Sequence, residues 1–385
     1  MKKSLVILFV VLCMLASVVP SMAKDIPDEI KIGWIGTISG SQAIDGWNMS
    51  NAIKLVEKEI EDAGGFKIDD KVVKVTFIGE DTEGKNDLAV NAAAKLVTQD
   101  GVIAILGANN SGDTIAAAQI TQEAKVPTIS NTGTNVRVTQ QGDFIFRACF
   151  IDPVQGKIAA AFIKNELGMN KAAIIFDNAD TYSTGLKEAF EESFKAIGGE
   201  IVEAQAFSGA DVKDYSAQLT NIKAADPEIV YVPCHIDNSP LIVQQMRANG
   251  IDCPVFGCES WDYQQFIDNS GPENVEGAYY TTGFSQEADT AKDFVAAFTE
   301  LAGERPGFSG AMMYEAAHIL LDAIQRAETI DGEGIRQALV ETDIDWLPSG
   351  GRVTFDENRN PTKSMVVLQI TDGLAKYVTT IAPED

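Results

Sequence analysis

The sequence predicts an α/β fold of two doubly wound parallel-sheet lobes joined by hinge crossovers. Short apolar runs alternate with amphipathic helical stretches, the pattern of a parallel sheet with helices on both faces. This alternation begins again after residues 144–147, so the chain contains two such units. No Pro-rich or Gly/Ser-rich linker separates them, which favours hinged lobes over independent domains.

The first unit reads as strands, each followed by a helix that returns the chain across the sheet. Its strands are expected at residues 30–35, 72–78, 102–106 and 127–130, and its helices at residues 43–63, 87–98 and 113–124. Gly64 and Gly65 directly follow the first helix, where glycine commonly ends a helix.

The second unit repeats this alternation, starting with a helix. Its helices are expected at residues 153–167, 184–196, 215–224 and 240–248, and its strands at residues 172–176, 201–207, 229–232 and 255–257.

The C-terminal part completes no third unit. It is mostly helical and then ends in strands: helices at residues 291–301, 310–327 and 334–341, strands at 353–356, 364–370 and 376–380. A tail this small is better shared between the lobes, which requires several crossovers. We therefore expect one lobe from residues 24–148 plus 282–353, and the other from residues 149–281 plus 354–385.

Residues 1–23 have the pattern of a secretory signal peptide. Lys2 and Lys3 precede an apolar run at residues 5–19, and Ser21-Met22-Ala23 offers a small-residue cleavage site. The run is too short for a stable membrane span, which makes the alternative of an N-terminal anchor the weaker one. We expect an exported protein that works in a bacterial periplasm and does not insert into the membrane.

The charge excludes two classes of partner. Removing 23 residues and two lysines from the 385-residue chain of charge −26 leaves 362 residues of charge −28. Phosphate backbones and anionic lipid surfaces would repel such a chain, so nucleic-acid and membrane-surface roles are not expected.

Four cysteines remain after cleavage. Cys253 and Cys258 lie an odd number of residues apart along one predicted strand and so face opposite ways. If a disulfide forms, Cys234 with Cys258 is the better pair, because both lie near the ends of strands that can be neighbours. The spacings fit no zinc site, and we expect no metal.

The motifs of common enzymes are absent. The chain has two histidines and no Gly-x-Ser-x-Gly elbow, phosphate-binding loop, dinucleotide fingerprint or His-Glu-x-x-His motif. The sequence therefore favours a binding protein over an enzyme and predicts no cofactor, although an exported α/β enzyme stays an alternative.

Three loops rich in small polar residues follow predicted strands of the first unit, at residues 37–46, 107–113 and 130–135. Ligands bind at this edge of open parallel sheets. Hydroxyls and free backbone N–H groups at helix starts suit a carboxylate. The alternative is that these loops are ordinary caps and turns.

The order of several motifs resembles the periplasmic branched-chain amino-acid binding proteins of ABC importers, a type I, Venus-flytrap class. These motifs are Ile38-Ser39-Gly40 with Gly46, Gly107-Ala108 with Ser111, Pro127-Thr128-Ile129-Ser130 with Thr134, Phe146-Arg147, Asp177, Tyr182-Ser183-Thr184-Gly185, Asp214-Tyr215-Ser216-Ala217-Gln218-Leu219, Tyr314-Glu315-Ala316 and Phe355-Asp356. Together they extend nearly to the C-terminus.

The resemblance implies how a free amino acid would be held. Ser111 and Thr134 would bind the ligand's carboxylate, and the Thr132 carbonyl would help to accept its ammonium. Glu259 matches the family's acidic residue from the second lobe, and Tyr182 matches its aromatic contact. Without the family, Glu259 reads as a solvated strand-end acid and Tyr182 as helix-start packing.

The chain departs from the family where the ligand's side chain should lie. Asn109 and Asn110 occupy positions that are more apolar in branched-chain binders, Asp45 lies where an aromatic residue is common, and His235 ends a second-lobe strand near the cleft. We expect a more polar amino acid, or a small amide, unless the two asparagines turn away into the helix cap and leave an apolar pocket.

The expected function is capture of an amino acid between two lobes that close by hinge motion, followed by delivery to an inner-membrane ABC permease. We expect the protein to act as a monomer. A sensory or regulatory protein of the same fold is the alternative that shares this ligand chemistry.

Overall fold

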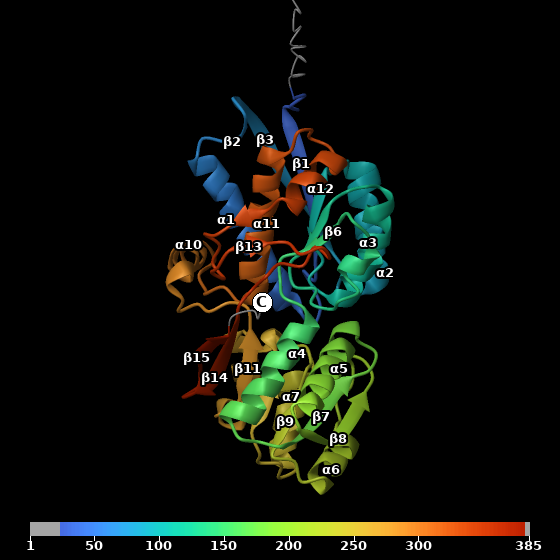
Figure 1. The fold of residues 1–385 in the computed structure, drawn as a ribbon, viewed down its shortest axis with the longest axis vertical. Coiled ribbons are helices and arrows are strands. Elements are labelled where there is room, and N and C mark those ends of the chain that lie inside the picture. Colours follow the sequence, from blue (N-terminus) through green and yellow to red (C-terminus); the bar gives the residue numbers. More distant parts are fainter. Residues whose placement is uncertain (1–23, 382–385) are drawn as a thin grey trace, which may run out of the picture.

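The computed structural model describes residues 24–381, which form two α/β lobes arranged along the long axis of the molecule (Figure 1). The predicted signal peptide at residues 1–23 lies outside the described residues. Among those that are described, no helix combines the length and apolar character needed to cross a membrane.

The first lobe is built on a sheet with the strand order β2-β3-β1-β4-β5-β6. Its strands are β1 (Glu29–Gly36), β2 (Phe66–Ile68), β3 (Lys71–Asp81), β4 (Ala104–Gly107), β5 (Thr128–Ser130) and β6 (Ile145–Arg147). All neighbours pair in parallel except β2, which forms an antiparallel hairpin with β3. Both β4 and β5 are completely buried, as expected for strands with helices on both faces.

The second lobe is built on a sheet with the order β15-β14-β11-β10-β9-β7-β8. Its strands are β7 (Lys171–Asp177), β8 (Glu200–Phe207), β9 (Ile229–Tyr231), β10 (Val255–Gly257), β11 (Tyr279–Thr282), β14 (Met365–Thr371) and β15 (Leu374–Ile381). The last two pair antiparallel, because the two-residue turn Asp372-Gly373 has positive φ at both positions and returns the chain as a hairpin.

Helices cover both sheets (Figure 1). The first lobe has α1 (Ala43–Asp62), α2 (Asn86–Lys95), α3 (Ser111–Glu123), α10 (Lys292–Ala302), α11 (Phe308–Arg326) and α12 (Gly332–Val340). The second has α4 (Asp152–Ala161), α5 (Thr181–Ala196), α6 (Ser216–Ala224), α7 (Ser239–Ala248), α8 (Gln264–Ser270) and α9 (Pro272–Val275). Helix α11 packs against α1, β4 and β5, so late chain segments complete the early lobe.

Shorter elements lie at helix ends and between the lobes. Single π-helical turns follow α2 and α4, at Leu96–Asp100 and Phe162–Glu166, and 3-10 turns occur at Thr139–Gln141, Glu259–Trp261 and Asp289–Ala291. The hairpin of β12 (Asp343–Ile344) and β13 (Val353–Thr354) precedes the last crossover.

The predicted fold class is confirmed, and most predicted elements are present. The sequence reading missed β2, β6, β11, β12, α8 and α9. These elements are short, so they contain too few residues to establish a period of two or of 3.6.

Three crossovers join the lobes within residues 24–381, after β6, β11 and β13. The ring of Phe150, on the first crossover, lies 5.5 Å from that of Phe308 at the start of α11, and a side chain on Gly283, on the second crossover, would come within 2.8 Å of Phe150. At the third, Lys363 forms a buried ion pair with Glu315 of α11. Aromatic packing and a buried ion pair therefore stabilise the crossovers that join the lobes.

Residues 355–361 contact the first lobe before the chain reaches β14. Arg359 donates through Nη2 to the Thr139 carbonyl at 2.8 Å and through Nε to the Ile145 carbonyl at 3.0 Å. The exact residues at which the two lobes divide remain a prediction.

Candidate ligand-binding site

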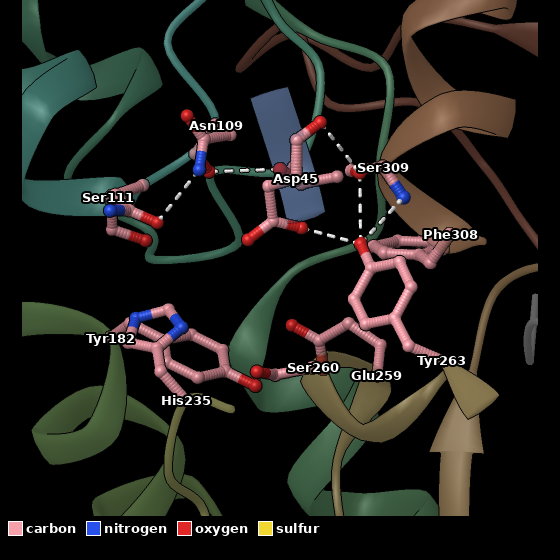
Figure 2. Close-up of a pocket in the computed structure, with 12 residues that line it drawn as sticks. Asp45, Asn109, Ser111, Tyr182, His235, Glu259, Ser260, Tyr263, Phe308 and Ser309 are labelled. Atoms are coloured by element: carbon pink, nitrogen blue, oxygen red, sulfur yellow. Dashed lines mark hydrogen bonds between the residues drawn. The ribbon is translucent and has the colours of Figure 1, made fainter. Parts of the chain in front are cut away.

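A pocket lies where the two lobes face each other, with about 350 Å³ of empty space that includes solvent at its opening (Figure 2). Its lining residues are Asp45, Asn109, Asn110, Ser111, Thr132, Tyr182, His235, Glu259, Ser260, Tyr263, Phe308 and Ser309. All the predicted site residues except Thr134 line it.

The start of α3 forms one part of the first-lobe wall. Ser111 is the first residue of this helix, whose first-turn N–H groups have no acceptor inside the helix. The Ser111 Oγ accepts a hydrogen bond from the Asn135 N–H at 3.2 Å, which leaves the hydroxyl proton available to a ligand. Because the helix dipole is positive here, this wall suits an anion.

The loop after β5 is held against α3 by a buried arginine. Arg147, at the end of β6, donates to the Gly133 carbonyl at 2.7 Å and to the Asn135 carbonyl at 2.8 Å. The Thr132 hydroxyl donates to the Asn109 carbonyl at 2.9 Å, which ties this loop to the loop after β4. These contacts hold the first-lobe wall in one shape.

Thr134 is completely buried and is not among the lining residues. Its carbonyl accepts from the Asp152 N–H at 3.0 Å. Burial raises the pKa of the Asp152 carboxyl to about 7, although the nearby Thr134 hydroxyl acts to lower it. The predicted contact of Thr134 with a ligand carboxylate remains a prediction.

Glu259 supplies an acid from the second lobe. It follows β10 in a 3-10 turn and is 5% exposed. Gln155 Nε2 donates to Glu259 Oε2 and also lies 2.9 Å from the Thr281 hydroxyl. Burial raises the pKa of Glu259, while the hydrogen bond from Gln155 and the nearby Tyr182 hydroxyl oppose that rise. Such a carboxylate is stabilised when a cation enters the cavity.

His235 and Tyr182 form a pair of tilted rings beside Glu259. Their ring centroids are 4.6 Å apart, and His235 Nε2 lies 3.5 Å from Asp180 Oδ2. Burial alone would lower the pKa of His235, but the Asp180 carboxylate and, more weakly, Asp237 and Asp45 raise it to about 9. The imidazole is therefore a cation at neutral pH.

Asp45 connects the lobes across the cavity. The Tyr263 hydroxyl of the second lobe donates to Asp45 Oδ1 and lies 2.8 Å from Ser309 Oγ. Ser309, at the start of α11, also donates to the Asp45 carbonyl at 3.3 Å. Burial raises the pKa of Asp45, and the hydrogen bond from Tyr263 opposes this rise.

The side chains of Asn109 and Asn110 line the cavity but mainly bond to the protein. Asn109 Oδ1 accepts from the Thr37 N–H at 3.0 Å, and its Nδ2 donates to Asn110 Oδ1 at 3.1 Å. Asn110 Nδ2 donates to Gln42 Oε1 at 2.9 Å, and Gln42 Nε2 reaches Asp237 of the second lobe at 3.0 Å. This amide chain is a second bridge between the lobes.

Four lining residues were missed by sequence reasoning: Ser260, Tyr263, Phe308 and Ser309. Ser260 lies in the same turn as Glu259, and Tyr263 directly precedes α8, so their proximity to Glu259 in the chain could have indicated them. Phe308 and Ser309 begin α11 after the loop that follows α10 rather than after a strand, and the rule that ligands bind beyond strand ends does not reach them.

The four cysteines within residues 24–381 are free thiols. Cys258 Sγ lies 3.6 Å from the Cys234 carbonyl, so these two residues are neighbours as expected, without a bond between them. Burial raises the pKa of both thiols well above the usual range. Within residues 24–381 no group of three or more His, Cys, Asp or Glu side chains could hold a metal ion.

The cavity therefore joins two kinds of wall. The first lobe presents a helix start with a free hydroxyl donor, and the second presents the Glu259 carboxylate. A molecule with a carboxylate and an ammonium would find an opposite partner for each charge.

Comparisons with known proteins show the family of this chain. Residues 29–375 match the family model described as periplasmic binding protein. The Leu/Ile/Val-binding protein homolog 7 of Brucella suis biovar 1 is 27% identical, over 97% of this chain and 95% of the relative.

Two crystal structures share the fold closely. A leucine binding protein, LivK, from Thermotoga maritima is 30% identical with a TM-score of 0.85, covering 92% of this chain and 99% of its own. The branched-chain amino acid binding protein LivJ from Streptococcus pneumoniae, in complex with isoleucine, is 30% identical with a TM-score of 0.85, covering 92% of this chain and 100% of its own.

Proposed function

This chain belongs to the periplasmic binding protein family, and we propose that it captures a free amino acid between its two lobes for delivery to an inner-membrane ABC permease. It works in the periplasm as a monomer, and it binds its ligand without converting it. The observation that carries this proposal is the facing of the Ser111 helix start and the Glu259 carboxylate across one cavity.

The charges of an amino acid fit these two walls. The ligand's carboxylate gains the Ser111 hydroxyl and the first-turn N–H groups of α3. Its ammonium gains Glu259, a buried carboxylate whose negative charge is only weakly offset by the His235 imidazolium. Since one ligand contacts both lobes only when they are closed, binding stabilises the closed form. The likeness to a protein crystallised with isoleucine supports this ligand class.

The proposal is tested by calorimetry of unfolded and refolded, ligand-free protein against the twenty proteinogenic amino acids. We expect a Kd of about 1 μM or tighter for at least one of them, because two buried charges each gain several hydrogen bonds. The ligand should be recovered chemically intact. No heat from any amino acid, together with binding of a sugar or a metal ion, would refute the proposal.

A further inference from the structure

We propose that the captured amino acid carries a neutral carboxamide side chain, as asparagine and glutamine do, and that Asp45 and His235 hold this group between them. This inference rests on the proposed function and assigns a ligand class within it. Its basis is that the two side chains offer complementary hydrogen-bonding groups from opposite lobes to the same cavity.

Asp45 offers an acceptor from the first lobe. Its Oδ1 is occupied by the Tyr263 hydroxyl, and the Ser309 hydroxyl holds its backbone carbonyl. The other carboxylate oxygen points into the cavity, toward the side on which His235 lies (Figure 2). Because the aspartate is fixed at both its side chain and its backbone, this oxygen is presented to a ligand in one position.

His235 offers a donor from the second lobe. Its Nε2 faces Asp180 at 3.5 Å, and the ring packs against the tilted ring of Tyr182, which restricts its orientation. The opposite edge of the ring, which carries Nδ1, faces the cavity (Figure 2). Since the pKa of His235 is about 9, both ring nitrogens carry protons at neutral pH, and the edge facing the ligand is a donor.

The charge of each side chain excludes other ligand classes. A cationic side chain such as that of lysine would meet the imidazolium, and an anionic one such as that of glutamate would meet Asp45. An aliphatic side chain would leave the acceptor and the donor buried without partners. A carboxamide donates through its NH2 to Asp45 and accepts through its oxygen from His235, so it satisfies both while adding no charge.

The asparagines of the cavity do not replace this pair. Asn109 and Asn110 were expected from the sequence to select a polar ligand, but their amides bond to each other, to Thr37 and to Gln42. They line the wall with groups that are already satisfied. Selection of the ligand's side chain is therefore assigned to Asp45 and His235.

Leucine, asparagine and aspartate form a matched set for the test, because their side chains have nearly the same shape and differ in polarity and charge. Ligand-free protein is titrated by calorimetry with these three and with glutamine, glutamate and lysine. We expect asparagine or glutamine to bind at least about tenfold more tightly than leucine, aspartate, glutamate and lysine, since each of these leaves a buried group unpaired or opposed.

Two variants test whether Asp45 and His235 cause the preference for a carboxamide. Asp45→Leu should shift the ratio of carboxamide to leucine affinity by at least about tenfold toward leucine, because the acceptor is lost and an apolar surface replaces it. His235→Gln, which keeps a donor but removes the charge, should reduce the discrimination against lysine by a similar factor. This second variant keeps the inference testable if Asp45→Leu fails to fold.

Ser41→Ala is the control. Ser41 donates to Asp237 of the second lobe at 3.2 Å and is not among the cavity-lining residues, so its loss should change the affinities for all ligands by one common factor. Tighter binding of leucine, lysine, aspartate or glutamate than of both carboxamides would overturn the inference and leave the proposed function standing. Binding of no amino acid would instead overturn the proposed function itself.

Discussion

The two walls of the cavity differ in how they handle charge. The first-lobe wall is made mainly of neutral groups, with Ser111 and Thr132 beside a helix start, and Asp45 is its one ionisable side chain. The second-lobe wall carries Glu259 and His235 next to tyrosine rings. Neutral donors can bind an anion without any buried protein charge, whereas a buried carboxylate needs a cation. The first wall is therefore suited to receive the ligand, and the second to drive closure over it.

If the first wall receives the ligand, it must be formed before the ligand binds. Substitution of Arg147 should have the largest effect on this preformed wall. Arg147→Met removes two hydrogen bonds to the carbonyls of Gly133 and Asn135 and leaves both buried. We expect the free energy of unfolding to fall by about 3 kcal/mol or more, measured by urea denaturation. Arg352→Met, on the exposed surface, is the control. Equal denaturation midpoints for the two variants would contradict a wall held by Arg147.

Glu259 is expected to carry the largest single contribution of the second wall to binding. Glu259→Gln should weaken the affinity for the amino acid by about 2 kcal/mol or more, because the ligand's ammonium is then buried without its counter-charge. Calorimetry measures the change. Glu273→Gln, the same substitution at an exposed position of the second lobe, should have no effect. An affinity of Glu259→Gln within twofold of the unmodified protein would remove this residue from the site.

The charge of His235 gives the second wall a contribution to stability that is lost at alkaline pH. The pKa of His235 is raised from 6.5 to about 9 by Asp180, Asp237 and Asp45. Its stabilisation of the folded protein is therefore complete below pH 6.5 and is lost as the pH rises through about 9.

Between pH 6.5 and pH 9.5 the unmodified protein should lose about 2 kcal/mol more of its free energy of unfolding than His235→Gln does. Denaturation of both proteins at the two pH values measures this difference. Parallel losses would show that the imidazole is not held as a cation in the folded state.

Sequence reasoning brought most of its predicted site residues to one cavity. Ser111 and Glu259 follow β4 and β10, so the rule for parallel sheets and the family motifs both pointed to them. Thr134 belongs to the same kind of loop, yet it is completely buried and does not line the cavity. A loop has no fixed period, so the sequence cannot tell which of its residues face the ligand.

The contacts between the lobes could not be predicted from the sequence. Tyr263 meets Asp45, which lies 218 residues earlier, and Gln42 meets Asp237, which lies 195 residues later. Hydrogen bonds over such separations follow from how the lobes face each other and leave no local pattern. The same contacts use the amides of Asn109 and Asn110, whose presence in the cavity was foreseen and whose partners were not.

In the proposed function, the second wall holds the ligand's ammonium and the first wall holds its carboxylate. This assignment is tested most directly by titrating the unmodified protein and Glu259→Gln with the bound amino acid and with its α-hydroxy analogue, in which a hydroxyl replaces the ammonium. We expect the substitution to weaken binding of the amino acid by about thirtyfold or more and binding of the hydroxy acid by less than about threefold. Equal losses for both ligands would contradict this assignment.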